Sequence, residues 1–285
     1  MSDRATQAEK ATRFKALHER PGAFVIPNPW DAGTARVLEG LGFEALTTTS
    51  AGLAFALGRS DGTRSVTRDE TLANARAIAD ATDLPVAADL ENGYGDAPEA
   101  AAETIRLAGT VAGLVGGSIE DATGDPRRPI YDFAHAVERV AAAVEAARAF
   151  PFPFVLVARA ENFIRGRPDL DDTIRRLQAF EAAGADVLFA PGLASADDIR
   201  TVCRSVRAPV NVIMGLKAVS FTVAELAALG VRRISLGSSL SRAALTGFVA
   251  AAREIKEHGT FTFTQSTLSY ADANALLAPR RSSAT

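Results

Sequence analysis

Short apolar runs alternate with longer segments of helical periodicity along the whole chain. Several of these runs are nearly continuous in apolar residues, as expected for parallel strands that are covered on both faces. Eight of them are predicted to be strands: Ala23–Pro27, Ala45–Ser50, Pro85–Glu91, Gly113–Asp121, Phe154–Glu161, Asp186–Pro191, Pro209–Gly215 and Arg233–Ser239. In the segments between them apolar residues recur at helical spacing, as at Leu170, Ile174 and Leu177, and would form one stripe of a helix.

The junctions from helix to strand resemble one another. At Gly42, Gly184 and Gly230 a glycine stands about two residues before a strand, where the end of a helix favours a residue of positive φ. Eight such units in one chain predict an α/β fold, a (β/α)8 TIM-type barrel. A doubly wound open sheet is the alternative. No Gly-x-Gly-x-x-Gly turn follows the first predicted strand, which disfavours a dinucleotide-binding version of that sheet.

The chain is expected to form a single barrel domain over residues 1–285, since no linker divides it. The barrel itself should occupy about residues 23–258, followed by a helical tail at about 259–279. A length of 285 residues is ordinary for one α/β barrel.

Helices are also predicted outside the eight repeats. Residues 1–22 should form a helix before the barrel, with Phe14 and Leu17 facing inward. Two helices should follow the barrel, at Ser241–His258 and Tyr270–Leu277. The last residues, 280–285, are expected to be disordered.

Composition and charge narrow the classes of function. A formal net charge of −3 gives no electrostatic reason to expect nucleic acid or an anionic membrane as a partner. No apolar run approaches the roughly 18 residues needed to span a bilayer, and the N-terminus lacks an apolar signal segment, so a cytoplasmic protein is expected. The single cysteine, Cys203, has no partner for an internal disulfide and is expected to be a small buried apolar residue.

The end of the third predicted strand carries two acids. Asp89 and Glu91 are two residues apart and would therefore project from the same face, while Gly93 and Gly95 let the backbone turn away. Carboxylate oxygens suit a hard divalent cation such as Mg²⁺. Taken alone, the pair is equally consistent with two solvated acids at a strand end.

Neighbouring strand ends strengthen the metal hypothesis. Barrel enzymes place their chemistry at the C-terminal ends of the strands, where Asp61 and Glu120 would join the pair near Arg159. Burying so many acids is costly unless a cation neutralises them. Zinc is disfavoured, because the histidines lie on predicted helices or helix ends and lack ligand spacing. The three histidines are His18, His135 and His258.

The segment Ser50-Ala51-Gly52 follows the second predicted strand and is expected to be a turn that binds a carboxylate. It offers a hydroxyl and backbone N–H groups, and Arg159 can add a bidentate clamp. A metal beside such a turn suits a 2-oxo acid, because the ion can stabilise an enolate as charge develops on the keto oxygen. Arg159 could instead, or in addition, form a salt bridge with Glu120 or Glu161.

In this order the motifs resemble the isocitrate lyase/phosphoenolpyruvate mutase superfamily, over about residues 10–275. The segments that carry the resemblance are Asn28-Pro29-Trp30-Asp31, Ser50-Ala51-Gly52 with Asp61, Asp89-x-Glu91-x-Gly93-Tyr94-Gly95, Ile119-Glu120-Asp121 and Ala158-Arg159. The acid-x-acid-x-Gly-Tyr-Gly element at this place in a barrel is the most specific of them.

The resemblance implies a barrel enzyme that binds Mg²⁺ or Mn²⁺ and works through an enolate-type intermediate. Asp89 would be the direct metal ligand, and Asp61, Glu91 and Glu120 would hold metal-bound water; Arg159, Glu120 and Asp61 are also the catalytic candidates. The implied substrate site consists of Trp30, Ser50, Ala51, Gly52, Arg159 and Asn211. The superfamily further implies a homotetramer, a dimer of dimers in which the last barrel helix is exchanged between subunits.

Two segments depart from the lyase pattern. Lyase members carry Lys-x-Cys-Gly-His after the fourth strand, whereas residues 122–131 contain neither cysteine nor histidine. Lyases also have a glutamate where this chain has Ala190-Pro191-Gly192, so cleavage of isocitrate or methylisocitrate in the usual way is disfavoured. The loop after the fourth strand is expected to close over the site, as a gating loop with Asp125, Arg127 and Arg128.

The leading hypothesis is a Mg²⁺-dependent carbon–carbon lyase of a small 2-oxo acid or dicarboxylate, similar to oxaloacetate decarboxylase. Three alternatives stay open. They are phosphonopyruvate hydrolase or phosphoenolpyruvate mutase chemistry at a P–C bond, a lyase of a substituted malate or citrate, and a non-catalytic binder of a 2-oxo acid.

Overall fold

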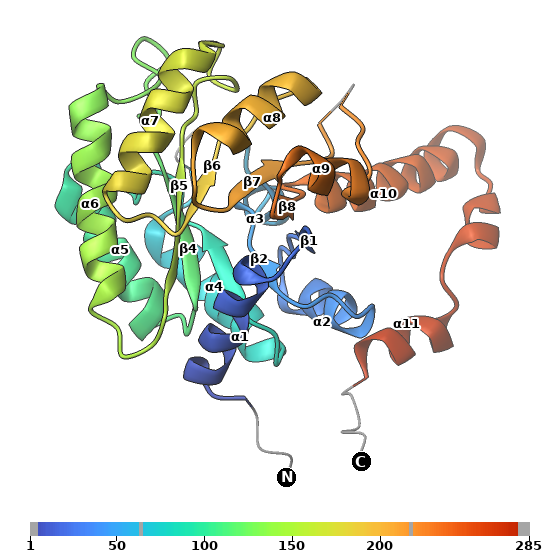
Figure 1. Ribbon diagram of the computed structural model, residues 1–285. Coiled ribbons are helices and arrows are strands. Elements are labelled where there is room, and N and C mark those ends of the chain that lie inside the picture. Colours follow the sequence, from blue (N-terminus) through green and yellow to red (C-terminus); the bar gives the residue numbers. More distant parts are fainter. Residues whose placement is uncertain (1–4, 63–64, 217–218, 279–285) are drawn as a thin grey trace.

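The eight strands in the described part of the chain form one parallel barrel (Figure 1). The computed structural model describes residues 5–62, 65–216 and 219–278. The strands are β1 (Phe24–Ile26), β2 (Leu46–Thr47), β3 (Val86–Asp89), β4 (Gly116–Glu120), β5 (Val155–Arg159), β6 (Val187–Phe189), β7 (Val210–Ile213) and β8 (Arg233–Ser235). Each lies within the range predicted from the apolar runs, and the (β/α)8 barrel is confirmed.

Strand order follows the sequence around the barrel. The pairing runs β1-β8-β7-β6-β5-β4-β3-β2. The sheet begins at β1 and finishes at β2, and these two edges are joined where the Thr47 N–H donates to the carbonyl of Pro27, after β1, at 3.1 Å. Every strand pair is parallel, so the C-terminal ends of the strands meet at one mouth of the barrel.

Helices surround this sheet. They are α1 (Gln7–Glu19), α2 (Ala32–Gly40), α3 (Ser50–Ala56), α4 (Arg68–Ala81), α5 (Pro98–Thr110), α6 (Phe133–Arg148), α7 (Leu170–Ala182), α8 (Ala196–Ser205), α9 (Val223–Leu229), α10 (Ser239–His258) and α11 (Tyr270–Leu277), with a 3₁₀ turn η1 (Thr262–Ser266). Capping boxes fix several starts: at Thr6, Thr67 and Thr222 the N-cap hydroxyl and a glutamate three residues later bond each other's backbone N–H.

Helix α1 closes the floor of the barrel, opposite the mouth. Phe14 faces inward as predicted and is fully buried, whereas Leu17 is only half-buried. His18 is buried as well, and its ring lies edge-on to Phe14 and to Phe24 of β1 at centroid distances of 4.8 and 5.0 Å. Gly116 of β4 leaves room for the Phe14 side chain, because a Cβ at position 116 would lie 2.8 Å from the Phe14 ring.

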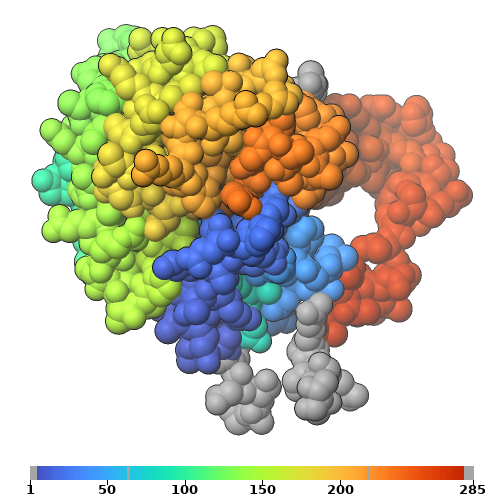
Figure 2. All heavy atoms as spheres, viewed as in Figure 1, coloured from blue at the N-terminus to red at the C-terminus, as the bar shows by residue number. Residues whose placement is uncertain are grey.

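The C-terminal tail leaves the barrel. Both helices predicted after the barrel are present, but Ser241 is the only buried residue of α10. Figure 2 shows an open gap between this tail and the barrel, and α11 then packs against α2. Large apolar side chains on the tail stay exposed, Phe248 at 70% and Tyr270 at 88%.

The remaining sequence-based expectations concern the C-terminal residues, the number of domains, Cys203 and membrane-spanning helices. The disorder predicted for 280–285 concerns residues outside those that the structure describes, and the single-domain assignment stays a prediction. Cys203 on α8 is half-buried rather than fully buried. In the described residues, no helix is long and apolar enough to cross a membrane.

Candidate functional site

Arg159, the last residue of β5, lies at the centre of the barrel mouth. Its Nη1 is 2.9 Å from Asp89 Oδ1 at the end of β3, and its Nη2 is 3.0 Å from Glu120 Oε2 at the end of β4. Nη2 also lies 2.8 Å from Glu161 Oε1. Burial disfavours the charged guanidinium, but the three carboxylates outweigh this and hold the pKa of Arg159 well above its usual range. The salt bridges considered in the sequence analysis are therefore present, and Asp89 is a further partner.

Asp89 also contacts the end of β2. Ser50 donates its hydroxyl to Asp89 Oδ2 at 3.0 Å and its backbone N–H to the same oxygen at 3.4 Å. The Asp89 N–H in turn donates to Thr48 Oγ1 at 3.1 Å. Ser50 thus holds the carboxylate that the sequence marks as the metal ligand, and Thr48 holds the backbone of the same residue.

The predicted Ser50-Ala51-Gly52 turn is instead the first turn of α3. Thr49 caps this helix by accepting from the Gly52 N–H at 3.2 Å. Glycine is required at position 52, because a Cβ would lie 2.5 Å from Thr49 Cγ2 and 3.0 Å from Trp30 Cβ. Ser50 thus lies in the first turn of α3 and bonds Asp89, and binding of a substrate carboxylate by residues 50–52 stays a prediction.

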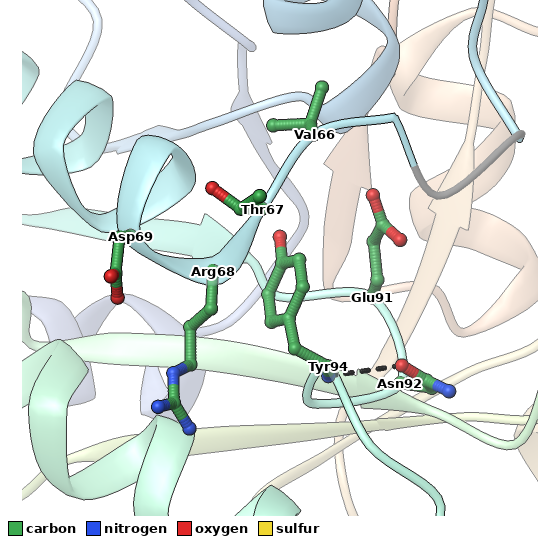
Figure 3. A pocket seen from close by; sticks show the side chains of 7 residues that line it. All are labelled: Val66, Thr67, Arg68, Asp69, Glu91, Asn92 and Tyr94. Atoms are coloured by element: carbon green, nitrogen blue, oxygen red, sulfur yellow. Dashed lines mark hydrogen bonds between the residues drawn. The ribbon is translucent and has the colours of Figure 1, made fainter.

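Glu91 begins the loop after β3 and adopts a left-handed backbone with φ of 48°. Burial, followed by the negative charges of Asp89 and Asp61, raises the pKa of Glu91 to about 7. Figure 3 shows Glu91 and Tyr94 on the wall of a cavity of about 410 Å³, opposite the start of α4 at Thr67. The second acid of the pair therefore faces open space next to the mouth.

Asp61 lies at the exposed rim of the mouth. Surrounding protein and the charge of Asp89 raise its pKa, while Arg165 and Arg159 act in the opposite direction. The acid predicted from the loop after β2 is thus within electrostatic reach of the acids on the strand ends.

Glu161 and Arg165 were not among the candidate site residues. Glu161 is fully buried, and Arg165 lies 3.2 Å from both Glu161 Oε2 and Glu120 Oε1. Burial and the charge of Glu161 raise the pKa of Glu120 well above its usual range. Two signals were present in the sequence. Glu161 is the last residue of the fifth predicted strand, and its i, i+4 spacing to Arg165 becomes informative once Glu161 is known to start a helical turn.

Negative charge exceeds positive charge at this mouth. Five carboxylates (Asp61, Asp89, Glu91, Glu120 and Glu161) face two guanidinium groups, and the pKa values of three of the acids are raised partly by their neighbours' charge. Such an all-oxygen set fits a hard divalent cation by charge and by donor type. In the part of the chain that the structure describes, no three acid, histidine or cysteine side chains form a ready-made metal centre, since Arg159 bridges Asp89 and Glu120.

Two other predicted substrate contacts, Asn211 and Trp30, have surroundings of their own. Asn211 is the second residue of β7 rather than its end, is 1% exposed, and donates from Nδ2 to Ser235 Oγ at 3.0 Å inside the barrel. Trp30 lines a groove of about 240 Å³ between α3 and α10, together with Phe55 and Phe248. Contact of Asn211 and Trp30 with a substrate stays a prediction.

The predicted gating loop is folded as a small hairpin. An antiparallel bridge joins Ala122 to Ile130 at its base. At its tip, Asp125 pairs with Arg127 at 3.4 Å, and the side chains of Arg127 and Arg128 are exposed. The loop borders the site in sequence, and its closure stays a prediction.

Comparison with known proteins adds independent information. The family model of phosphoenolpyruvate phosphomutase matches residues 14–256. A crystal structure of a Burkholderia cenocepacia J2315 protein, provisionally described as a lyase/mutase, matches with a TM-score of 0.93 and 59% identity over 96% of this chain and 97% of that one. An uncharacterized protein of Mycobacterium tuberculosis is 33% identical over 244 residues, 86% of this chain and 89% of its own. The oxaloacetate decarboxylase of Bradyrhizobium diazoefficiens is 30% identical over 204 residues, 70% of this chain and 68% of that enzyme.

Proposed function

Because the chain belongs to the phosphoenolpyruvate phosphomutase family, within the isocitrate lyase/phosphoenolpyruvate mutase superfamily, we propose that it is a metal-dependent lyase of a small 2-oxo acid. Decarboxylation of oxaloacetate is the leading reaction. The observation that carries this proposal is the pairing of Arg159 with Asp89 and Glu120 beside Ser50. This arrangement combines a carboxylate-binding cation with acids suited to a divalent metal.

Asp89 would hold Mg²⁺ or Mn²⁺, with Asp61, Glu91 and Glu120 around it. The ion, when bound, supplies a Lewis acid for the charge that develops on the keto oxygen. Ser50 and Arg159 bind and orient the substrate carboxylate. To do so, Arg159 releases one of its protein carboxylates and pairs with the carboxylate of the substrate instead.

Decarboxylation suits a gating loop without cysteine. The bond between the β-carboxylate carbon and its neighbour breaks, CO₂ leaves, and the electron pair enters the enolate of pyruvate, which then takes up a proton. The bond-breaking step requires no protein acid. A relative that shares 30% identity is named as an oxaloacetate decarboxylase, which favours this member of the possible substrate class.

The test measures pyruvate release from oxaloacetate with Mg²⁺ and after removal of metal with EDTA. We expect metal-dependent turnover that Asp89→Ala reduces at least about a hundredfold, whereas Asp197→Asn, at an exposed side chain of α8, leaves it unchanged. Full activity of Asp89→Ala would remove the metal assignment. Equal rates of pyruvate release with and without the protein would exclude decarboxylation.

The same preparation separates the alternatives. Phosphate release from phosphonopyruvate would indicate P–C chemistry, and cleavage of dimethylmalate or methylisocitrate would indicate a lyase of a substituted malate or citrate. A non-catalytic binder would show a raised melting temperature with a 2-oxo acid plus Mg²⁺ but no turnover, because a ligand that binds only the folded state stabilises it.

We also propose that the protein is a homotetramer. The exposed apolar side chains of α10 and of the segment that follows it, including Phe248 and Phe261, suit burial against another subunit. A homotetramer with exchanged α10 helices would cover them. The cytoplasmic location expected from the sequence stays a prediction.

A further inference from the structure

Arg139 lies on helix α6 and not on a strand. Its guanidinium nevertheless reaches the loop after β3, which carries Glu91. The side chain is 1% exposed. Its donors bond four backbone carbonyls of residues 92–97, and the Asp96 carboxylate lies close enough to act on the guanidinium electrostatically. The four carbonyls are those of Gly95 at 2.8 Å and Ala97 at 3.1 Å, and those of Asn92 and Asp96. One buried charge thus organises the whole turn after β3.

This turn needs such support. Glu91 and Tyr94 both have positive φ, 48° and 61°, which side-chain-bearing residues rarely adopt. Backbone strain of this kind persists only where the surroundings over-determine the conformation. Burying a guanidinium costs several kcal/mol unless its donors are paired. The turn pairs Nη1 and Nη2 of Arg139 and leaves Nε without a partner, so Arg139 and the turn stabilise each other through the two terminal nitrogens.

The opposite face of Arg139 contacts the base of the gating loop. Its Cζ lies 4.5 Å from the centroid of the Tyr131 ring. The Tyr131 hydroxyl donates to Asp96 Oδ1 at 2.6 Å and accepts from Asn92 Nδ2 at 3.0 Å. Tyr131 follows the Ala122–Ile130 bridge directly, and its N–H donates to the Asp121 carbonyl at 2.8 Å.

We propose that Arg139 and Tyr131 form a positioning unit that couples the gating loop to the turn bearing Glu91. A movement of the hairpin that displaces Tyr131 removes the ring from Arg139 and the hydroxyl from Asn92, the residue after Glu91. Conversely, occupancy of the metal site fixes the turn and, through Tyr131, the base of the hairpin. The effect of the metal on the hairpin rests on the proposed function. The contacts of Tyr131 with Arg139, Asn92 and Asp96 link the turn to the hairpin whether or not a metal binds.

The experiment uses two readouts that do not depend on a known substrate. Mn²⁺ binding is measured by electron paramagnetic resonance, and opening of the hairpin is measured as the rate of trypsin cleavage after the exposed Arg127. The variants are Tyr131→Phe, which keeps the ring, and Arg139→Met with its conservative counterpart Arg139→Lys. Arg106→Met, at an exposed arginine of α5, is the matched control.

We expect Arg139→Met to weaken Mn²⁺ binding about tenfold, as loss of an outer support of a metal site does, with partial recovery in Arg139→Lys. Tyr131→Phe removes both hydrogen bonds of the hydroxyl and should speed cleavage after Arg127 at least about fivefold. It should also abolish the protection from trypsin that Mn²⁺ gives the wild type. Melting temperatures measured in parallel identify a variant that has merely unfolded.

Wild-type cleavage rates in folded Tyr131→Phe, with or without Mn²⁺, would overturn the coupling. If the wild type binds no Mn²⁺, the proposed function loses its metal, while the cleavage rates of metal-free Tyr131→Phe and Arg139→Met still decide the coupling.

Discussion

At the scale of single residues, Arg159 holds three carboxylates at once, and all of its partners are largely buried. Removing one partner of a buried ion pair leaves the others uncompensated. A change at Arg159 should therefore affect stability and substrate binding together, and the two effects can be separated by the choice of replacement.

Arg159→Met is expected to lower the free energy of unfolding by about 3 kcal/mol or more and to abolish turnover of oxaloacetate. Arg159→Lys keeps the charge but not the planar fork, so it should recover part of the stability and little of the activity. Urea denaturation and the pyruvate assay measure the two effects. Arg175→Met, at an exposed arginine, is the control, and retained turnover in Arg159→Met would contradict the assigned role.

His18 predicts a pH dependence of stability that is independent of the barrel mouth. Burial and then the charge of Arg233 lower its pKa from 6.5 to about 3. The folded state therefore binds fewer protons than the unfolded state between these values, so the contribution of His18 is present above pH 6.5 and is lost as the pH falls. The loss at pH 5 should be about 2 kcal/mol.

The free energy of unfolding is measured from pH 7 to pH 4.5. Replacing His18 with Phe should remove the part of its decrease at low pH that is due to His18. His258→Asn, at the exposed end of α10, should leave the wild-type curve in place. An unchanged slope in His18→Phe would show that another group is responsible.

The sequence predicted that Asp89, Glu120 and Arg159, which strands position, would lie together, and it missed Arg165, which a loop positions. Asp89, Glu120 and Arg159 follow from the rule that barrel chemistry lies at strand ends. Arg165 reaches Glu120 only because the segment after β5 forms a turn, which no apolar pattern marks. Asn211 was implied by the family resemblance; it is the second residue of β7, where its amide donates to Ser235, and its contact with a substrate stays a prediction.

At the scale of elements, α1 acts as the floor of the barrel. Phe14 fills the interior beneath Gly116 and lies against Arg233, whose Cζ is 5.8 Å from its ring. Phe14→Ala should cost about 3–5 kcal/mol, because it opens a cavity that neighbouring strands cannot close. Urea denaturation checks this, with exposed Thr12→Ala on the same helix as the control. A cost below about 1 kcal/mol would mean that α1 is not needed to close the floor.

Predicting elements from sequence worked best for the strands and least well for the segments between them. The eight apolar runs gave the strands, and the tail helix Tyr270–Leu277 has the predicted limits. The segment after β2, Ser50-Ala51-Gly52, was expected to be a turn that offers a hydroxyl and backbone N–H groups. It is helical because Thr49 caps it and Gly52 allows Trp30 to approach.

At the scale of the whole molecule, the tail has too little contact with its own barrel to bury its apolar side chains. If α10 packs on a neighbouring subunit, Phe248→Asp should reduce the mass measured by light scattering from that of a tetramer toward that of a smaller species. Lys256→Asp, which changes charge on the same helix, should retain the wild-type mass. A monomeric wild type would refute the exchanged-helix assembly.

The packing at Gly52 has a practical consequence for assays. Its nearest neighbours include Trp30 and also Ser241, whose Cβ would lie 3.6 Å from a Cβ at position 52. The start of α10 is therefore adjacent to the helix that presents Ser50 to Asp89. If subunits separate on dilution, α10 loses its support and this contact loosens, so specific activity should fall as enzyme concentration is lowered. Screens at nanomolar enzyme could then miss a substrate that the protein turns over at micromolar concentration.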